Sequence, residues 1–550
     1  MKRRLTGTIL ILTTVFLAFF VLNASAADKL AKKQVLTIAF DMGDAKTFDP
    51  HSAASTVDRA TVDMIFNGLV RYTPGNQVEV EPDLAESWSV SPDGKVWTFH
   101  LRKGVFFHPF PGNPDGYELT SEDVVYSLKK AANPQTSAYA GEYSGLDFKA
   151  TDAVTVEITV EKPMSKTLFL DKVANYAGGF IVCKKAIEAQ GYDWFKMNPV
   201  GTGPFLFKSF EPQQKTTLVR NAKYFRGAPI LEQVVVRYMP DVSSREFGLR
   251  TGELDVIEGQ KEDQWIEKIA SFPQVSVNSF GPCEVQMLNF NLTKKPFDDI
   301  RVRKAFCYAV SREEVAAFMG KSLAVPIYSA ALAPPSPGAL TKEDAEKAGV
   351  VYENNIEKAK QLLAEAGYPN GLETEAIVSE NDSSYRKPMI AIQAQVKKAG
   401  INMNVKIVEH SSFHSMVRQD ASPLVYYACW RPNVDVFLTR FYHSESTVVS
   451  GKKPDTNFSH YGTVDANGDG KIDSIDQLID TARWELDSQK QIKLWQEAQI
   501  QVLKDVAALP VIRLKYDFPM KSYIDLGYPL EFSWETYSPP ITEKTRVLEH

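Results

Sequence analysis

The sequence lacks the motifs by which the common enzyme classes are recognised. It contains no Gly-x-Ser-x-Gly elbow, no His-Glu-x-x-His pair, no glycine-rich phosphate loop and no paired-cysteine metal site. Internal repeats, low-complexity tracts and linker-like stretches are also missing. These absences argue against a hydrolase or a nucleotide-binding enzyme. They also indicate domains that share a sheet or a hinge, which the chain crosses more than once.

Long hydrophobic runs occur only at the N-terminus. Lys2-Arg3-Arg4 precede an apolar stretch from residue 5 to residue 22, and Ala24-Ser25-Ala26 gives the small-x-small pattern of a cleavage site. We therefore predict a signal peptide over residues 1–26, in preference to a membrane anchor. Because no cysteine adjoins the cleavage site, the exported protein is not expected to be a lipoprotein.

Basic residues do not outnumber acidic ones. Removing residues 1–26 takes away three basic and no acidic residues, and shifts the formal net charge from −6 to −9. An acidic exported protein is a poor partner for nucleic acid or for an anionic membrane surface. The hydrophobic content of 44% is typical of a globular protein and argues against disorder.

Strands and helices are predicted in alternation along the chain. Apolar patterns indicate strands at 35–40, 154–160 and 234–238, and helices at 296–310, 355–366, 389–399 and 475–506. The last helix should break near Asp487-Ser488, and another should begin at Thr120 with Asp123 at the capping-box position. This mixture predicts an α/β or α+β fold.

Eight short motifs then occur in order along the chain. They are TFDPH (47–51), IFNGLV (65–70), PDLAESW (82–88), WTFHLRKGVFFH (97–108), LTSEDVVYS (119–127), NPVGTGPF (198–205), GELD (252–255) and KPFDDIRVRKAF (295–306). The series resembles the family 5 extracellular solute-binding proteins, the peptide-binding subunits of bacterial ABC importers. NPVGTGPF is the most specific of them, because its glycines and proline fix the angle at which the chain enters a strand.

The resemblance implies an α/β, two-lobed periplasmic-binding-protein fold of type II, similar to cluster C. Lobe one would comprise residues 27–80, 196–282 and 509–550, with an inserted domain at 81–195, and lobe two would comprise 283–508. A ligand would lie between the lobes and be enclosed when they close about the hinge.

The function that the resemblance implies is capture of a peptide and its delivery to the membrane permease subunits of an ABC importer. The protein is expected to be a periplasmic monomer, not an enzyme, and to bind no nucleic acid. An oligosaccharide or another non-peptide solute, such as an opine, a nickel complex or haem, stays open as the ligand. A secreted hydrolase is disfavoured.

The ligand site is expected where a carboxylate can meet the α-ammonium of a peptide. In the resembling family that acid follows a tryptophan of lobe two; here Trp430 matches and Asp435 is the nearest acid. Counting three residues on from Trp430 gives Asn433 instead, so either Asp435 binds the ammonium or the ligand is not an ordinary peptide. Arg431 either orients Asp435, binds a ligand carboxylate or lies at the rim.

Two further segments are candidates for ligand contacts. The segment at Ala54 and Ser55 is expected to offer main-chain hydrogen bonds from lobe one. Asn289 and Asn291 alternate on a strand, so they either face the cleft together or end a sheet.

Cysteine is scarce, with four in the whole chain. Cys283 opens lobe two and Cys429 adjoins Trp430, and we predict a disulfide between them, although four cysteines allow three full pairings. Cys183 and Cys307, in an apolar run and a helix, are expected to be buried thiols.

The stretch at 465–476 follows the spacing of a calcium loop. Its predicted ligands are Asp465, Asn467, Asp469, the carbonyl of Lys471, Asp473 and Asp476, with Gly470 at the sharp turn. A structural Ca²⁺ is predicted, against the alternative of a polar turn that caps the following helix. His410 and His414 are spaced to share a metal if their segment is helical, but no third ligand is evident and a polar helix face is the simpler interpretation.

Overall fold

The computed structural model describes residues 29–53, 55–143, 145–174, 177–281, 285–429, 431, 433–450, 456–532 and 538–550. The predicted signal peptide, residues 1–26, lies outside them. Within these ranges, no helix is both long enough and apolar enough to cross a membrane.

Lobe one is built on a seven-stranded sheet with the order β12-β19-β11-β1-β10-β9-β8. Its strands are β1 (Val35–Phe40), β8 (Phe205–Glu211), β9 (Lys215–Arg220), β10 (Gln233–Tyr238), β11 (Val256–Ile257), β12 (Val275–Phe280) and β19 (Tyr516–Lys521). β1 lies parallel to both β10 and β11, in the middle of the sheet. The lobe also carries α1 (Thr56–Asp63), α6 (Val242–Thr251), α7 (Asp263–Ala270), the hairpin β2 (Val70–Thr73) and β3 (Asn76–Pro82), and the short pair β20 (Ile524–Asp525) and β21 (Arg546–Val547).

A separate antiparallel sheet, with the order β4-β5-β7-β6, interrupts lobe one. Its strands are β4 (Ala85–Val90), β5 (Val96–Leu101), β6 (Leu146–Asp152) and β7 (Thr155–Val160), and its helices are α2 (Ser121–Ala131), η1 (Ala140–Tyr143), α3 (Lys166–Leu170), η2 (Ala177–Gly179), α4 (Lys184–Gln190) and α5 (Tyr192–Phe195). Trp97 stacks on Phe169 at 4.2 Å between ring centroids and fixes α3 against the sheet. The predicted start of α2 is confirmed, because the Asp123 carboxylate accepts from the Thr120 amide at 3.0 Å.

Lobe two has a four-stranded sheet with the order β14-β18-β13-β17 and a parallel pair β15-β16. The strands are β13 (Val285–Phe290), β14 (Ala324–Pro326), β15 (Leu372–Ser379), β16 (Ile401–Val408), β17 (Leu424–Cys429) and β18 (Ala508–Leu514). The helices are α8 (Ile300–Ala309), α9 (Arg312–Met319), α10 (Lys342–Lys347), α11 (Ile356–Glu365), η3 (Asp382–Arg386), α12 (Lys387–Lys398), α13 (His410–Arg418), α14 (Val434–Tyr442), η4 (Ser444–Ser446), α15 (Asp476–Trp484) and α16 (Ser488–Lys504). The predicted break near residue 487 is confirmed, since Asp487 caps α16 through the amides of Gln489 and Lys490.

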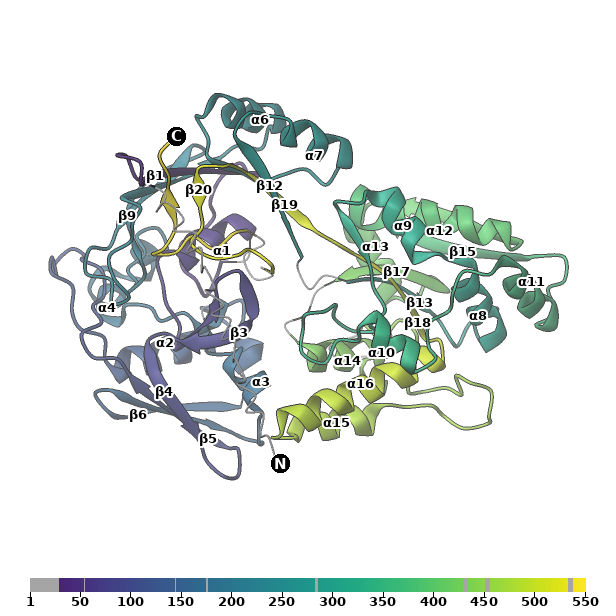
Figure 1. Ribbon diagram of the computed structural model, residues 1–550. Coiled ribbons are helices and arrows are strands. Elements are labelled where there is room, and N and C mark those ends of the chain that lie inside the picture. The colour runs from purple at the N-terminus through teal and green to yellow at the C-terminus, as the bar shows by residue number, and fades with distance from the viewer. Residues whose placement is uncertain are drawn as a thin grey trace, which may run out of the picture.

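The chain crosses between the lobes twice, on adjacent strands (Figure 1). β12 and β19 pair in lobe one, while β13 and β18 pair in lobe two, so the crossings lie at 281–285 and 514–516. The predicted boundary at residue 509 is therefore corrected: β18 pairs with β13 through Leu288 and Leu509 and belongs to lobe two. Lys515 holds the crossing in place, because its amide donates to the carbonyl of Leu323 at 2.6 Å.

Candidate functional site

A cavity of about 340 Å³ lies between the two lobes. Lobe one contributes the hairpin β2–β3 and the end of α3, and lobe two contributes the loop before α10 and the start of α14. The residues that line it are Tyr72, Val78, Glu79, Val80, Lys166, Thr167, Leu170, Asp171, Ser336, Pro337, Asn433 and Phe532. Because both lobes supply its wall, any movement about the hinge opens or closes this cavity.

Asp171 is one of two carboxylates, with Glu79, among the residues that line this cavity. It follows α3 directly and accepts hydrogen bonds from the Tyr72 hydroxyl at 2.9 Å and, across the lobes, from the Asn433 amide at 3.5 Å. Burial raises the pKa of Asp171 to about 6, and these two neutral donors and the Lys172 charge lower it only in part. The site therefore holds an acid whose charge is poorly balanced and would gain from a cation.

Charged groups of both signs surround Asp171. Lys172 donates to the carbonyl of Glu142 at 2.7 Å. Burial lowers the pKa of Lys172, while Glu142, Asp171 and Asp435 counteract the shift. Burial raises the pKa of Glu142, against the field of Lys172 and, from lobe two, of Arg440. The acids and bases of lobe one thus act electrostatically on α14 of the other lobe.

Two arginines of lobe two lie close enough to repel each other. Burial lowers the pKa of Arg440, and the neighbouring Arg431 guanidinium lowers it further. Arg431 also stacks on Phe441, with 5.2 Å between its guanidinium carbon and the ring centroid. An anion placed between two like charges relieves their repulsion, but neither arginine is among the residues that line the cavity.

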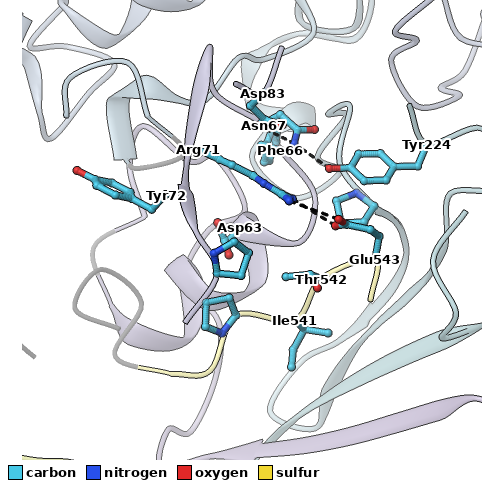
Figure 2. A pocket seen from close by; sticks show the side chains of 13 residues that line it. Asp63, Phe66, Asn67, Arg71, Tyr72, Asp83, Tyr224, Ile541, Thr542 and Glu543 are labelled. Atoms are coloured by element: carbon cyan, nitrogen blue, oxygen red, sulfur yellow. Dashed lines mark hydrogen bonds and ion pairs between the residues drawn. The ribbon is translucent and has the colours of Figure 1, made fainter. Parts of the chain in front are cut away.

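A smaller cavity, of about 30 Å³, lies within lobe one (Figure 2). Its charges are paired: Arg71 forms two hydrogen bonds to Glu543, at 3.3 and 3.4 Å, and a third to Glu81 at 2.6 Å. Asn67 donates to the Tyr224 hydroxyl at 3.2 Å beside them. The volume accommodates about one water molecule. This cluster ties the C-terminal segment to β2, so we place the functional site in the larger cavity.

The model of the family described as bacterial extracellular solute-binding proteins, family 5, matches residues 79–447. The chain belongs to this family. It is 36% identical to a protein from A. tumefaciens solved in complex with mannopinic acid, with a TM-score of 0.71 over 94% of this chain and 100% of that one. It is 27% identical to the dipeptide-binding protein of Escherichia coli over 89% of this chain and 91% of that protein. HbpA2 from Haemophilus parasuis is 25% identical, with a TM-score of 0.80 over 94% of this chain and 100% of that one.

In this solute-binding protein the two candidates for the acid position face different ways. Asn433 caps α14 by accepting from the Val436 amide at 3.0 Å and lines the cavity. Asp435 is only 7% exposed, and it accepts from Arg483 of α15 at 3.1 Å, inside lobe two. Burial raises the pKa of Asp435, and Arg483 counteracts the shift. Asn433, not Asp435, therefore faces the cavity.

The other predicted contact residues have structural partners. Ser55 caps α1, its hydroxyl accepting from the Asp58 amide at 3.2 Å. Asn289 is 1% exposed and donates to the carbonyl of Val425 on its own sheet at 3.3 Å, so it does not line the cavity. Asn291 donates to Asp420 at 2.7 Å, at the end of β13. Ala54 and Trp430 lie outside the described residues.

The predicted calcium loop is held by its own hydrogen bonds. Asp465 accepts from the amides of Gly468 and Gly470, both at 2.7 Å. Asp473 accepts from the Asn467 side chain at 2.7 Å. Asp476, at the twelfth position, instead accepts from the Ser444 amide at 3.0 Å.

The side chains of this loop are not arranged as the ligands of a calcium ion would be. Among the described residues, no three or more of the side chains of His, Cys, Asp and Glu gather where they could hold a metal. With Asp476 turned away, the twelfth ligand position of such a loop lacks its carboxylate. Calcium binding by Asp465, Asn467, Asp469, Lys471 and Asp473 stays a prediction.

The predicted disulfide cannot be placed, because Cys283 lies outside the described residues. Cys429 ends β17 and pairs in register with Val285, at the start of β13. Cys183 and Cys307 are buried thiols, as predicted. Burial raises the pKa of both to about 12, so neither is reactive at neutral pH.

The sequence alone did not indicate Asp171, Lys172 or Glu142. All three lie in the inserted domain, far along the chain from α14. Their approach to α14 depends on how the two lobes are arranged, which the sequence does not show. The one local signal is the charged pair Asp171-Lys172 directly after the apolar run Leu168–Leu170.

Proposed function

We propose that this protein binds a short peptide with free termini in the cavity between its lobes and presents it, unaltered, to the permease of an ABC importer. The observation that carries the proposal is one cavity of about 340 Å³ between the lobes, lined by charges of both signs from lobe one, Glu79, Lys166 and Asp171, and by the Asn433 amide of lobe two. A zwitterionic ligand balances both sets of charges, whereas a neutral oligosaccharide leaves them buried and unbalanced.

In this account Asp171 binds the ligand ammonium, the role predicted for Asp435. The Asn433 side chain, which already reaches Asp171 at 3.5 Å, is placed to share that ammonium through its oxygen or to move aside for it. Arg440 and Arg431 of lobe two do not line the cavity, so in this account they act on the ligand carboxylate at longer range. Because side chains of both lobes line the cavity, ligand binding favours the closed arrangement.

The size of the cavity indicates a ligand of two or three residues. Small-molecule sites typically measure about 300–1,000 Å³, and this one lies near the lower limit. Export of the chain to the periplasm rests on residues 1–26, and the permease subunits are its expected membrane partner. We infer that no chemistry follows binding, because the matching family is one of solute-binding proteins.

A second candidate ligand is mannopinic acid or a related carboxylic acid. Two observations favour it: an amide, Asn433, stands where an acid was expected, and the chain is 36% identical to the protein solved with mannopinic acid. The adjacent guanidinium groups of Arg431 and Arg440 suit a ligand with more than one carboxylate.

Isothermal titration calorimetry with a ligand panel tests the proposal. The panel comprises dipeptides, tripeptides, N-acetylated and C-amidated dipeptides, a neutral trisaccharide and mannopinic acid. We expect free dipeptides or tripeptides to bind and the blocked peptides and the trisaccharide not to bind. Tight binding of the trisaccharide, or a ligand recovered chemically altered by mass spectrometry, would overturn the proposal. Tight binding of mannopinic acid alone would select the second candidate.

A further inference from the structure

Two histidines on α13 of lobe two meet ring nitrogen to ring nitrogen. His410 and His414 are spaced i, i+4, and their Nε2 atoms are 3.2 Å apart. The ring centroids are 4.6 Å apart with the planes at 79°. The helix places the pair because Glu409 caps it, accepting from the amides of Ser411 and Ser412 at 2.9 and 2.8 Å.

This spacing is the one that a metal ion imposes on two ligands. Imidazole nitrogens bound at about 2.0–2.1 Å to a tetrahedral ion lie roughly 3.3 Å apart. The observed 3.2 Å falls at that value without any movement of either ring. A metal-free pair of this geometry needs one Nε2 to carry a proton and the other to accept it.

The second nitrogen of each ring already has an oxygen partner. Nδ1 of His410 lies 2.8 Å from the Ser379 hydroxyl on β15, and Nδ1 of His414 lies 3.3 Å from the Tyr427 hydroxyl on β17. Metal-binding histidines characteristically donate their other ring N–H to such an oxygen, which fixes the tautomer and the ring orientation. Residues of three elements, α13, β15 and β17, therefore contact the two rings, whose Nε2 atoms lie 3.2 Å apart.

The pair is open to solvent in part. Both rings are half-buried. Arg418 is engaged nearby, donating to the carbonyl of His414 at 3.2 Å and to the Tyr427 hydroxyl at 3.4 Å.

We propose that His410 and His414 form a two-histidine site for a late first-row divalent metal ion. Cu²⁺ should bind more tightly than Ni²⁺ or Zn²⁺, following the usual order for nitrogen ligands. In the described part of the chain, no third side chain of His, Cys, Asp or Glu joins the pair. Water or another small ligand therefore completes the coordination. The site is separate from the interlobe cavity, whose lining includes neither histidine.

The test is a Cu²⁺ titration of the untagged exported protein, first stripped of metal with a chelator. We expect one Cu²⁺ per protein, with two imidazole nitrogens in the electron paramagnetic resonance spectrum. H410Q and H414Q should each weaken binding by at least about tenfold and leave one imidazole in the spectrum. Tyr427→Phe should weaken it by about tenfold through the ring orientation.

The matched control is H100Q, because His100 is exposed on β5 of the inserted domain. H100Q should bind Cu²⁺ as the wild type does. If H410Q and H414Q both fold, as judged by circular dichroism, and both keep wild-type affinity and a two-nitrogen spectrum, the site does not exist. A wild-type spectrum with no imidazole nitrogen would overturn the proposal as well.

Discussion

Asp171 and Asp435 are two carboxylates, one in each lobe: Asp171 lines the cavity between the lobes, Asp435 does not, and they differ in what balances their charge. Asp435 accepts from the Arg483 guanidinium at 3.1 Å within its own lobe. Asp171 accepts from a hydroxyl and an amide, one of them across the cleft. Burial raises the pKa of both. Asp435, paired with an arginine inside its own lobe, stabilises that lobe. Asp171, which accepts hydrogen bonds from neutral donors between the lobes, can still bind a cationic group of a ligand.

The largest effect should come from breaking the structural pair. Arg483→Ala leaves Asp435 as an uncompensated buried charge, and we expect it to lower the free energy of unfolding by about 3 kcal/mol. The dipeptide affinity should stay within about twofold of wild type, since no ligand contact is lost. Thermal and urea denaturation measure the first quantity and calorimetry the second.

Two variants control this prediction. Asp435→Asn in the Arg483→Ala background should recover part of the lost stability, because it removes the unpaired charge. Asp480→Asn removes the more exposed partner of Arg483, at 3.0 Å, and should cost little. A collapse of ligand affinity in Arg483→Ala with stability intact would mean that Asp435 faces the ligand after all.

The second-largest effect should be a loss of ligand affinity when the Asp171 carboxylate is neutralised. Asp171→Asn keeps the shape of the side chain but removes the charge that we assign to the ligand ammonium. A charge-assisted hydrogen bond contributes about 1.5–3 kcal/mol, so the dissociation constant should rise roughly 10- to 150-fold. Asp435→Asn is the matched change on the other side of the cleft and should leave ligand affinity nearly unchanged. Equal losses in the two variants would remove the distinction between the carboxylates.

Ligand affinity should also depend on pH through Asp171. Its pKa of about 6 lies above the usual value of an aspartate, so the group takes up a proton as the pH falls through 6. The protonated form cannot balance an ammonium, so affinity is present above pH 6 and lost below it. From pH 7 to pH 5 the dissociation constant should rise by about tenfold. Asp171→Asn should flatten this profile. Any pH dependence that survives in Asp171→Asn would belong to another group, such as Glu142.

The smallest effect is expected from calcium, far from both carboxylates. If residues 465–473 bind Ca²⁺ with a dissociation constant on the order of 10⁻⁴ M, 1 mM calcium should stabilise the fold by about 1.4 kcal/mol. Asp465→Asn should abolish this gain, while Asp476→Asn should retain it because Asp476 contacts Ser444. Differential scanning calorimetry with calcium and with a chelator measures the gain. A melting temperature that does not respond to calcium would refute the predicted site.

Several local features could be predicted from the sequence because they depend on local physics. The cap at Thr120 and the break at Asp487 follow from side chains that bond to amides two or three residues away. The boundary near residue 509 could not be placed, because β18 and β19 are consecutive strands that pair in different sheets.

The sequence indicated the segment 433–435 of the candidate site, but not which of its residues faces the cavity and not Asp171. Asn433 and Asp435 differ by two positions, which is roughly 200° around a helix axis, so one faces the cavity and the other the lobe interior. Choosing between them requires the exact first residue of α14, which sequence patterns do not fix. Asp171 lies some 260 residues earlier in the chain, and its approach to Asn433 depends on how the lobes are arranged.

A double-mutant cycle between Asp171 and the ligand ammonium tests the central claim most directly. Calorimetry would compare the tightest-binding dipeptide with its N-acetylated form, on the wild-type protein and on Asp171→Asn. If Asp171 binds the ammonium, acetylation should weaken binding to the wild type by roughly 10- to 150-fold and to Asp171→Asn by less than about threefold. The same loss on both proteins would show that the ammonium is bound elsewhere, and would contradict the account.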